Sequence, residues 1–213
     1  RGATANQYFV GLHFASGSSG SSVRGLSISN FGRGQISVVN SSNNTFAGNL
    51  IGLRANGNAG GGNVGIRFYT AQNNTIGGTT LADRNHVGSV GNDGIQMENG
   101  AAYNQVIGNY IGIGLDGTTR RGNSSDQLDI QLGAHHNWIG GIILDGQDNP
   151  VLDVNGRVQA DPNKRNIIGG GRGDGMELTH TTETAYNHVV GNWIGLDAFG
   201  NPMANGEDGI NLE

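Results

Sequence analysis

Three acidic residues, Glu98, Asp129 and Glu177, lie in or beside a short phrase that recurs along the chain. The phrase alternates apolar and polar residues, and its clearest copies occupy positions 65–68, 94–97, 129–132, 175–178 and 209–212. Alternation is the period of a β-strand, in which every second side chain points to the same face. If the copies lie side by side, the three acids are expected to project together from the outer face.

Grouped carboxylates can do two kinds of chemistry. A hard cation such as Ca²⁺ needs several oxygen ligands, so Glu98, Asp129 and Glu177 are the candidate ligands for a bound Ca²⁺. Glycoside hydrolysis needs two carboxyl groups about 5 to 10 Å apart, one of them a general acid. The alternation predicts Cα atoms of Asp129 and Glu177 roughly 8 Å apart. A solvated polar face without chemistry is the alternative interpretation.

Other polar side chains are expected on or near this face. His135 and His180 follow the phrase and are candidate catalytic bases, because a neutral imidazole can accept a proton near neutral pH. Arginine forms paired hydrogen bonds with carboxylates, which suits contact with an acidic sugar. The candidate substrate-binding residues are Arg67, Tyr69, Gln96, Gln131, Arg121 and Arg172. The predicted register places one outward column at Arg67, Gln96, Gln131, Glu177 and Asn211.

A second repeated phrase predicts the framework that positions these residues. It opens with asparagine at positions 44, 74, 104, 137 and 187, and in three copies a Gly-Asn pair follows four residues later. Each repeat then contains three short strands, one after each asparagine and one in the alternating phrase. Strands this short bury no face alone, but stacking them about 4.8 Å apart buries a continuous apolar column. The asparagines are expected to form side-chain ladders and to tolerate the left-handed turn conformation.

Insertions alternate between two positions in successive repeats. The longest, residues 142–164, separates the first and second strands of its repeat and is expected to be a polar surface loop. Its last residue, Lys164, is the only lysine in the chain. The insertion opens at the edge away from the proposed groove, so Lys164 is not expected to be catalytic.

Composition excludes several classes of protein. The chain has 213 residues, 40 of them glycine, no cysteine, and a formal net charge of −5 from 12 basic and 17 acidic residues. No basic stripe suits nucleic acid, and no apolar run approaches the roughly 18 residues of a membrane span. We expect residues 1–213 to form one all-β domain, a right-handed parallel β-helix of six or more rungs with three short strands each. We expect this β-helix to be either a complete protein or a repeat-bearing part of a larger chain.

The repeats over about residues 22–212 resemble the parallel β-helix proteins of the pectate-lyase-like superfamily. That superfamily includes polysaccharide lyases, glycoside hydrolases, epimerases, tailspikes and adhesins. The resemblance implies a secreted or cell-surface protein whose polysaccharide substrate lies along the outer face of the alternating strand. Fold alone does not choose among these activities.

Three functions follow as expectations. The first is cleavage of an acidic polysaccharide by β-elimination, in which Ca²⁺ or arginine neutralises a uronate and a base removes the C5 proton. The second is glycoside hydrolysis by two of the three acids. The third is a non-enzymatic adhesin, spike or filament subunit. Its copies would stack end to end, because the sequence stops inside a strand at residues 209–212 and an open rung exposes unpaired backbone.

Overall fold

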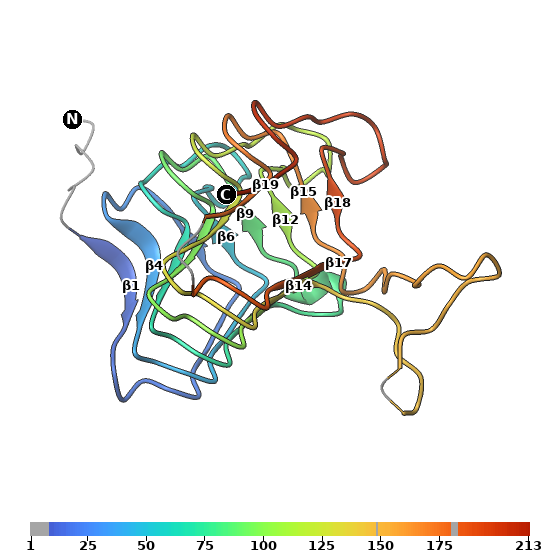
Figure 1. Cartoon of the computed structure of the whole chain (residues 1–213). Helices are drawn as coiled ribbons and strands as arrows, with labels where there is room; N and C mark the ends of the chain where they lie inside the picture. The colour runs from blue at the N-terminus through green and yellow to red at the C-terminus, as the bar shows by residue number, and fades with distance from the viewer. Residues whose placement is uncertain (1–8, 148, 180–182) are drawn as a thin grey trace.

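The computed structural model describes residues 9–147, 149–179 and 183–213. They form a right-handed parallel β-helix, in which every third strand returns to the same sheet (Figure 1). All pairs between the named strands are parallel and join successive rungs. The predicted fold class, with three short strands per rung, is therefore confirmed.

Three sheets form the walls of the helix. Sheet A contains, in spatial order, β1 (Val10–Phe14), β4 (Gly34–Val39), β7 (Ile66–Tyr69), β10 (Ile95–Glu98), β13 (Leu128–Ile130), β16 (Met176–Leu178) and β19 (Ile210–Leu212). Sheet B contains β2 (Ser22–Arg24), β5 (Thr45–Ala47), β8 (Thr75–Gly77), β11 (Gln105–Ile107), β14 (Trp138–Gly140) and β17 (His188–Val190). Sheet C contains β3 (Ser27–Ile28), β6 (Leu50–Ile51), β9 (His86–Val87), β12 (Tyr110–Ile111), β15 (Ile167–Ile168) and β18 (Trp193–Ile194).

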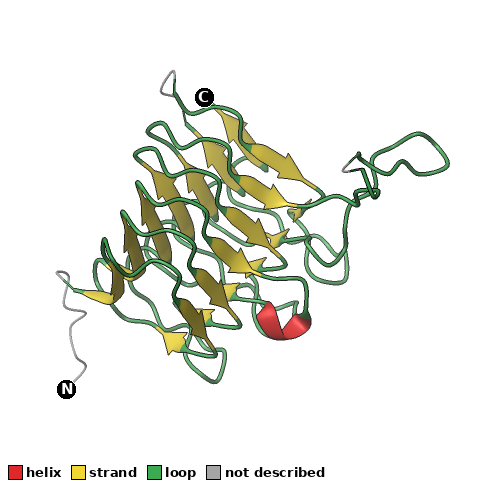
Figure 2. Cartoon of the chain, turned by 90° about the horizontal axis from the view of Figure 1, so that it is seen from below, coloured by secondary structure: helices red, strands yellow, loops and turns green. Residues whose placement is uncertain are grey.

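Loops of very different length connect the walls. A short 3₁₀ helix, η1 (Leu81–Asp83), lies between β8 and β9 and is seen in Figure 2. The insertion between β14 and β15 leaves the stack as a projecting arm (Figure 1). Antiparallel bridges such as Ile142 to Ala160 and Leu152 to Val158 order this arm, so it is more regular than the expected surface loop. Within the described residues, no helix is long and apolar enough to cross a membrane.

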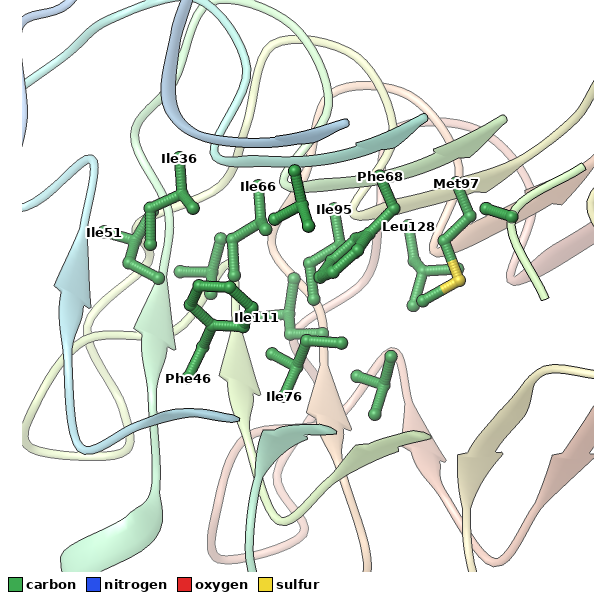
Figure 3. Close-up of a cluster of buried hydrophobic side chains, with 14 of the residues drawn as sticks. Ile36, Phe46, Ile51, Ile66, Phe68, Ile76, Ile95, Met97, Ile111 and Leu128 are labelled. Carbon is green, nitrogen blue, oxygen red and sulfur yellow. The ribbon is translucent and has the colours of Figure 1, made fainter. Parts of the chain in front are cut away.

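The interior is filled by columns of inward-pointing apolar side chains. Ile36, Ile66 and Ile95 lie in register on neighbouring strands of sheet A and are fully buried (Figure 3). Phe46 packs edge-on against Phe68, with ring centroids 5.9 Å apart. Burial of these side chains drives folding, because each strand alone is too short to exclude water.

Two asparagine ladders align the rungs. In one, the backbone N–H and Nδ2 of Asn74 both donate to Oδ1 of Asn104 at 2.9 Å, and Asn104 repeats this toward Asn137 at 3.0 Å. The members of this ladder are Asn44, Asn74, Asn104, Asn137 and Asn187. The second contains Asn49, Asn85, Asn109, Asn166 and Asn192. The predicted side-chain ladders are confirmed.

The left-handed conformation lies one residue earlier than predicted. Tyr103 and His136, which precede ladder asparagines, have φ of 57° and 55°. Asn104 and Asn137 themselves do not have positive φ. The preceding residue makes the turn, which leaves each asparagine free to face the next rung.

Removing one ladder amide should destabilise the whole stack. We expect Asn104→Ala to lower the free energy of unfolding by about 2 to 4 kcal/mol, because two donors of Asn74 lose their buried acceptor. Chemical denaturation measures this change. The matched control is Asn155→Ala on the exposed part of the arm, which should stay within about 0.5 kcal/mol of the parent. Equal effects of the two substitutions would contradict the role of the ladder.

Candidate functional site

Asp129 lies in a different register from the one that the sequence predicts. It pairs with Gln96 on one side and with Glu177 on the other. The alternating phrase of this rung is therefore residues 127–130, and the predicted position 129–132 is wrong by two residues. Because side chains alternate, a slip of two keeps Asp129 on the outer face but moves it along the strand. Leu132 belongs to the turn, where its φ is 50°.

The outer face of sheet A carries two columns in this corrected register. The first contains Ser37, Arg67, Gln96, Asp129, Glu177 and Asn211. The second contains Val39, Tyr69 and Glu98, and Gln131 follows them because its N–H donates to the carbonyl of Met97. Gln131 therefore lies in the second column, whereas the sequence had predicted it in the first. Asp129 and Glu177 are direct neighbours, closer than the expected 8 Å, because adjacent strands lie about 4.8 Å apart.

Glu98 does not join the other two acids. Its carboxylate accepts hydrogen bonds from Nε of Arg67 at 2.7 Å and from Nη2 of the same guanidinium, and the residue is only 3% exposed. The expectation that Glu98, Asp129 and Glu177 project together to solvent is wrong, because Arg67 engages and buries Glu98. Within the described part of the chain, no group of three or more His, Cys, Asp or Glu residues is arranged to hold a metal ion.

Four aspartates that we did not single out from the sequence form a third ladder beside this face. The N–H of Asp126 donates to Asp93 at 3.3 Å, that of Asp174 to Asp126 at 2.7 Å, and that of Asp208 to Asp174 at 2.6 Å. A signal was present for Asp93, Asp174 and Asp208, each of which directly precedes the opening glycine of an alternating phrase. Asp126 takes the same position only in the corrected register. Together with Asp129 and Glu177, they make the outer face acidic at its C-terminal rungs.

Asp129 is enclosed by the side chains around it. Its Oδ2 accepts hydrogen bonds from Gln131 at 2.7 Å and Gln96 at 3.3 Å, and its buried Oδ1 has no hydrogen-bond partner. Burial, followed by the charge of Asp93, raises the pKa of Asp129 to about 8, although the hydrogen bond from Gln96 acts in the opposite direction. Asp129 therefore carries a proton at neutral pH.

Glu177 lines an open polar pocket of about 520 Å³. Asp126, Asp174 and Arg172 are among the residues that share this lining. Burial, followed by the negative charge of Asp126, raises the pKa of Glu177 to about 7. Glu177 therefore titrates near neutral pH at the wall of the pocket.

The N-terminal rungs carry a second, basic pocket on the same face. Its volume is about 380 Å³, and His13, Arg33, Arg67 and Tyr69 are among its lining residues. Arg67 and Tyr69, predicted to contact substrate beside the acids, thus face a separate hollow. The outer face of sheet A is basic at one end and acidic at the other.

The remaining predicted residues are dispersed. Arg172 lines the acidic pocket as expected. Arg121 does not, because its Nε donates to the carbonyl of Gly57 at 2.9 Å in a different group of loops. His135 lies in the turn between β13 and β14, where its Nδ1 is 2.9 Å from Nδ1 of His136 and its ring packs edge-on against Tyr103. His180 lies outside the described residues.

The raised pKa of Asp129 predicts how stability depends on pH. The folded state keeps this proton up to about pH 8, whereas the unfolded state releases it near pH 4. The free energy of unfolding therefore falls as pH rises from about 4 to about 8. We expect Asp129→Asn to abolish this loss and to stabilise the chain at pH 8 by at least about 1 kcal/mol. Thermal unfolding from pH 4 to pH 9 measures the effect.

Glu98→Gln is the matched comparison, since it also neutralises a buried carboxyl group on this face. It should destabilise the chain at pH 8, because Arg67 loses its ionic partner. Stabilisation by Glu98→Gln, or destabilisation by Asp129→Asn at that pH, would contradict the assignment of charges.

Comparison with known proteins gives no match. No protein-family model, curated protein sequence or solved structure matches the chain. The parallel β-helix is therefore established by the stacking of the three sheets.

Proposed function

We propose that the acidic pocket binds a neutral polysaccharide and hydrolyses one of its glycosidic bonds. One observation carries this proposal: Glu177, whose pKa is raised to about 7, lines an open pocket together with the carboxyl groups of Asp126 and Asp174. Glycoside hydrolases use a carboxyl pair of which one member is protonated near neutral pH. The sequence resemblance to pectate-lyase-like proteins, and with it a secreted or cell-surface location, supports a polysaccharide as the substrate.

The two carboxyl groups take different roles in the proposed reaction. Glu177, whose pKa is raised to about 7, donates its proton to the glycosidic oxygen as the bond from that oxygen to the anomeric carbon breaks. A second carboxylate of the pocket lining, Asp174 or Glu207, accepts a proton from the water molecule whose oxygen joins the anomeric carbon. Asp129 has no direct part, because Gln96 and Gln131 cover its carboxyl group. It is a positioning residue behind the pair.

The charge of the pocket favours a neutral sugar at the cleavage point. Asp126, Asp174, Glu177, Glu207 and Glu213 line it, and Arg172 is the one cationic side chain among its described lining residues. Uncompensated carboxylates repel a polyuronate, whereas the hydroxyl groups of a neutral sugar donate hydrogen bonds to them. Hydrolysis therefore suits this pocket better than the β-elimination expected from the sequence.

β-Elimination on an acidic polysaccharide remains a second candidate because of the basic pocket. The side chains of His13, Arg33 and Arg67 face the same hollow and suit a sugar carboxylate. This activity would need a cation such as Ca²⁺ to neutralise the acids next to the cleavage point. Its product has an unsaturated end that absorbs ultraviolet light, and the product of hydrolysis does not.

Loss of the general acid should slow hydrolysis strongly. We expect Glu177→Gln to lower the rate of reducing-end release from neutral glycans by about 10²- to 10⁴-fold. The unsubstituted chain should lose activity as pH rises through about 7, where Glu177 loses its proton. Asp153→Asn, in an exposed turn of the arm, is the matched control and should leave the rate unchanged.

The same screen includes polyuronates with added Ca²⁺ and with a chelator. An ultraviolet-absorbing product that needs Ca²⁺ would replace the hydrolysis proposal with the lyase. Failure of the unsubstituted chain to cleave any glycan would favour the non-enzymatic adhesin or filament subunit.

A further inference from the structure

A small pocket lies on sheet B, at the base of the projecting arm. Its volume is about 210 Å³, and it is lined by Gln105, Ile107, Trp138, Gly140, Gly141, Ile142, Leu144 and Lys164. Strands β11 and β14 supply its floor, and both ends of the arm supply its sides. A pocket of this size accommodates one ring, since sites for drug-sized ligands begin near 300 Å³.

Trp138 gives this pocket an aromatic surface. Its ring stacks on His188 with centroids 4.2 Å apart and an angle of 18° between the rings, so one face is occupied. Gln105 is its register partner on the opposite side, and both residues line the pocket. Trp138 is nevertheless 39% exposed, which is high for so large an apolar side chain.

Lys164 adds a positive charge to the lining of the same pocket. The arm brings it back to sheet B, where Gly141 leaves room for it: a Cβ on Gly141 would lie 2.4 Å from Cδ of Lys164. Among the described residues, the nearest carboxylate oxygen is that of Asp161, which forms an ion pair with Nζ at 3.8 Å, too long for a hydrogen bond. Within this part of the chain, no carboxylate therefore takes the hydrogen bonds of the ammonium group.

We propose that this pocket binds a uronic acid residue of a glycan. The apolar face of the sugar ring packs against Trp138, its carboxylate pairs with Lys164, and its hydroxyl groups bond to the amide of Gln105. Ile142 and Leu144 form the apolar side. A neutral sugar offers no negative charge to the ammonium group, and a flat aromatic acid makes no use of Gln105, so a uronate uses more of the lining than either.

This binding site requires no cleavage and is independent of the proposed hydrolysis. It lies on sheet B, whereas the acidic pocket lies on sheet A and its flanking loops. The two pockets select differently, because one is acidic and the other carries the only lysine of the chain. A polysaccharide with a neutral backbone and uronate substituents would satisfy both.

Tryptophan fluorescence tests the proposal directly, because the chain has only 2 tryptophans. In a Trp193→Phe variant, Trp138 is the sole reporter. We expect methyl glucuronide to change its fluorescence in a saturable way, with methyl glucoside and benzoate each at least about tenfold weaker. Calorimetric titration of the chain with both tryptophans should give the same order of affinity, which keeps the test valid if the variant folds poorly.

Lys164→Gln should lower the affinity for methyl glucuronide to that for methyl glucoside, and salt should weaken only the glucuronide. Arg165→Gln is the matched control, because the guanidinium of this neighbouring cation lies over Trp193; it should leave binding unchanged. Glu177→Gln should also bind normally, which separates this site from catalysis. No saturable change, equal binding of benzoate, or unchanged affinity in Lys164→Gln would overturn the proposal.

Discussion

The rest of the structure depends on a hydrogen bond that crosses from one rung to the next. In each asparagine ladder, one Oδ1 accepts both the backbone N–H and the side-chain amide of the neighbouring asparagine. This bond fixes the position of each turn relative to the next, so the strands on either side cannot slip. The outward columns of sheet A exist because the turns are held in this way. Without fixed register, no two polar side chains on this face would have a defined distance.

The aspartate ladder keeps a side-chain oxygen bonded to the backbone N–H of an adjacent rung but changes the chemistry. Asp93, Asp126 and Asp174 accept such N–H donors, yet a carboxylate has no amide to donate to its neighbour. Burial, together with the negative charge of the stacked carboxylates, raises the pKa of Asp129 and Glu177 close to them. The aspartate ladder thus has two effects: it aligns the rungs as the asparagine ladders do, and it makes its wall of the helix acidic. This is why the candidate site lies on the wall with the aspartate ladder.

The outer face of sheet A changes from basic to acidic along the stack because different rungs carry different charged residues. Arg67 neutralises Glu98 near the middle of the face, leaving a basic pocket toward the N-terminal rungs and an acidic one toward the C-terminal rungs. A solenoid permits such separation because each rung contacts only its neighbours. The arm between β14 and β15 uses the same freedom to build an aromatic pocket on sheet B without disturbing the ladders.

The sequence by itself determined the solenoid, its three strands per rung and its asparagine ladders. The ladder asparagines recur at positions such as Asn44, Asn74 and Asn104. A departure from the pattern in one repeat therefore does not hide the pattern of the others. It also determined that Asp129 and Glu177 face outward, because alternation survives a register error of two residues. The aspartates at 93, 174 and 208 were within reach of the same reasoning, since they too recur at one position of the repeat.

Only the tertiary structure decided the register of Asp129 and the state of each acid. Gln127 stands where the copies at 65–68, 94–97, 175–178 and 209–212 begin with glycine, so those copies alone did not choose between two alignments that differ by two residues. Whether a carboxyl group is neutralised, covered or open depends on side chains from other rungs: Arg67 for Glu98, Gln96 and Gln131 for Asp129, and Asp126 for Glu177. The presence of Lys164 and Trp138 in the lining of one pocket likewise depends on how the arm returns to the stack. Such contacts are set by three-dimensional packing, which a one-dimensional repeat does not encode.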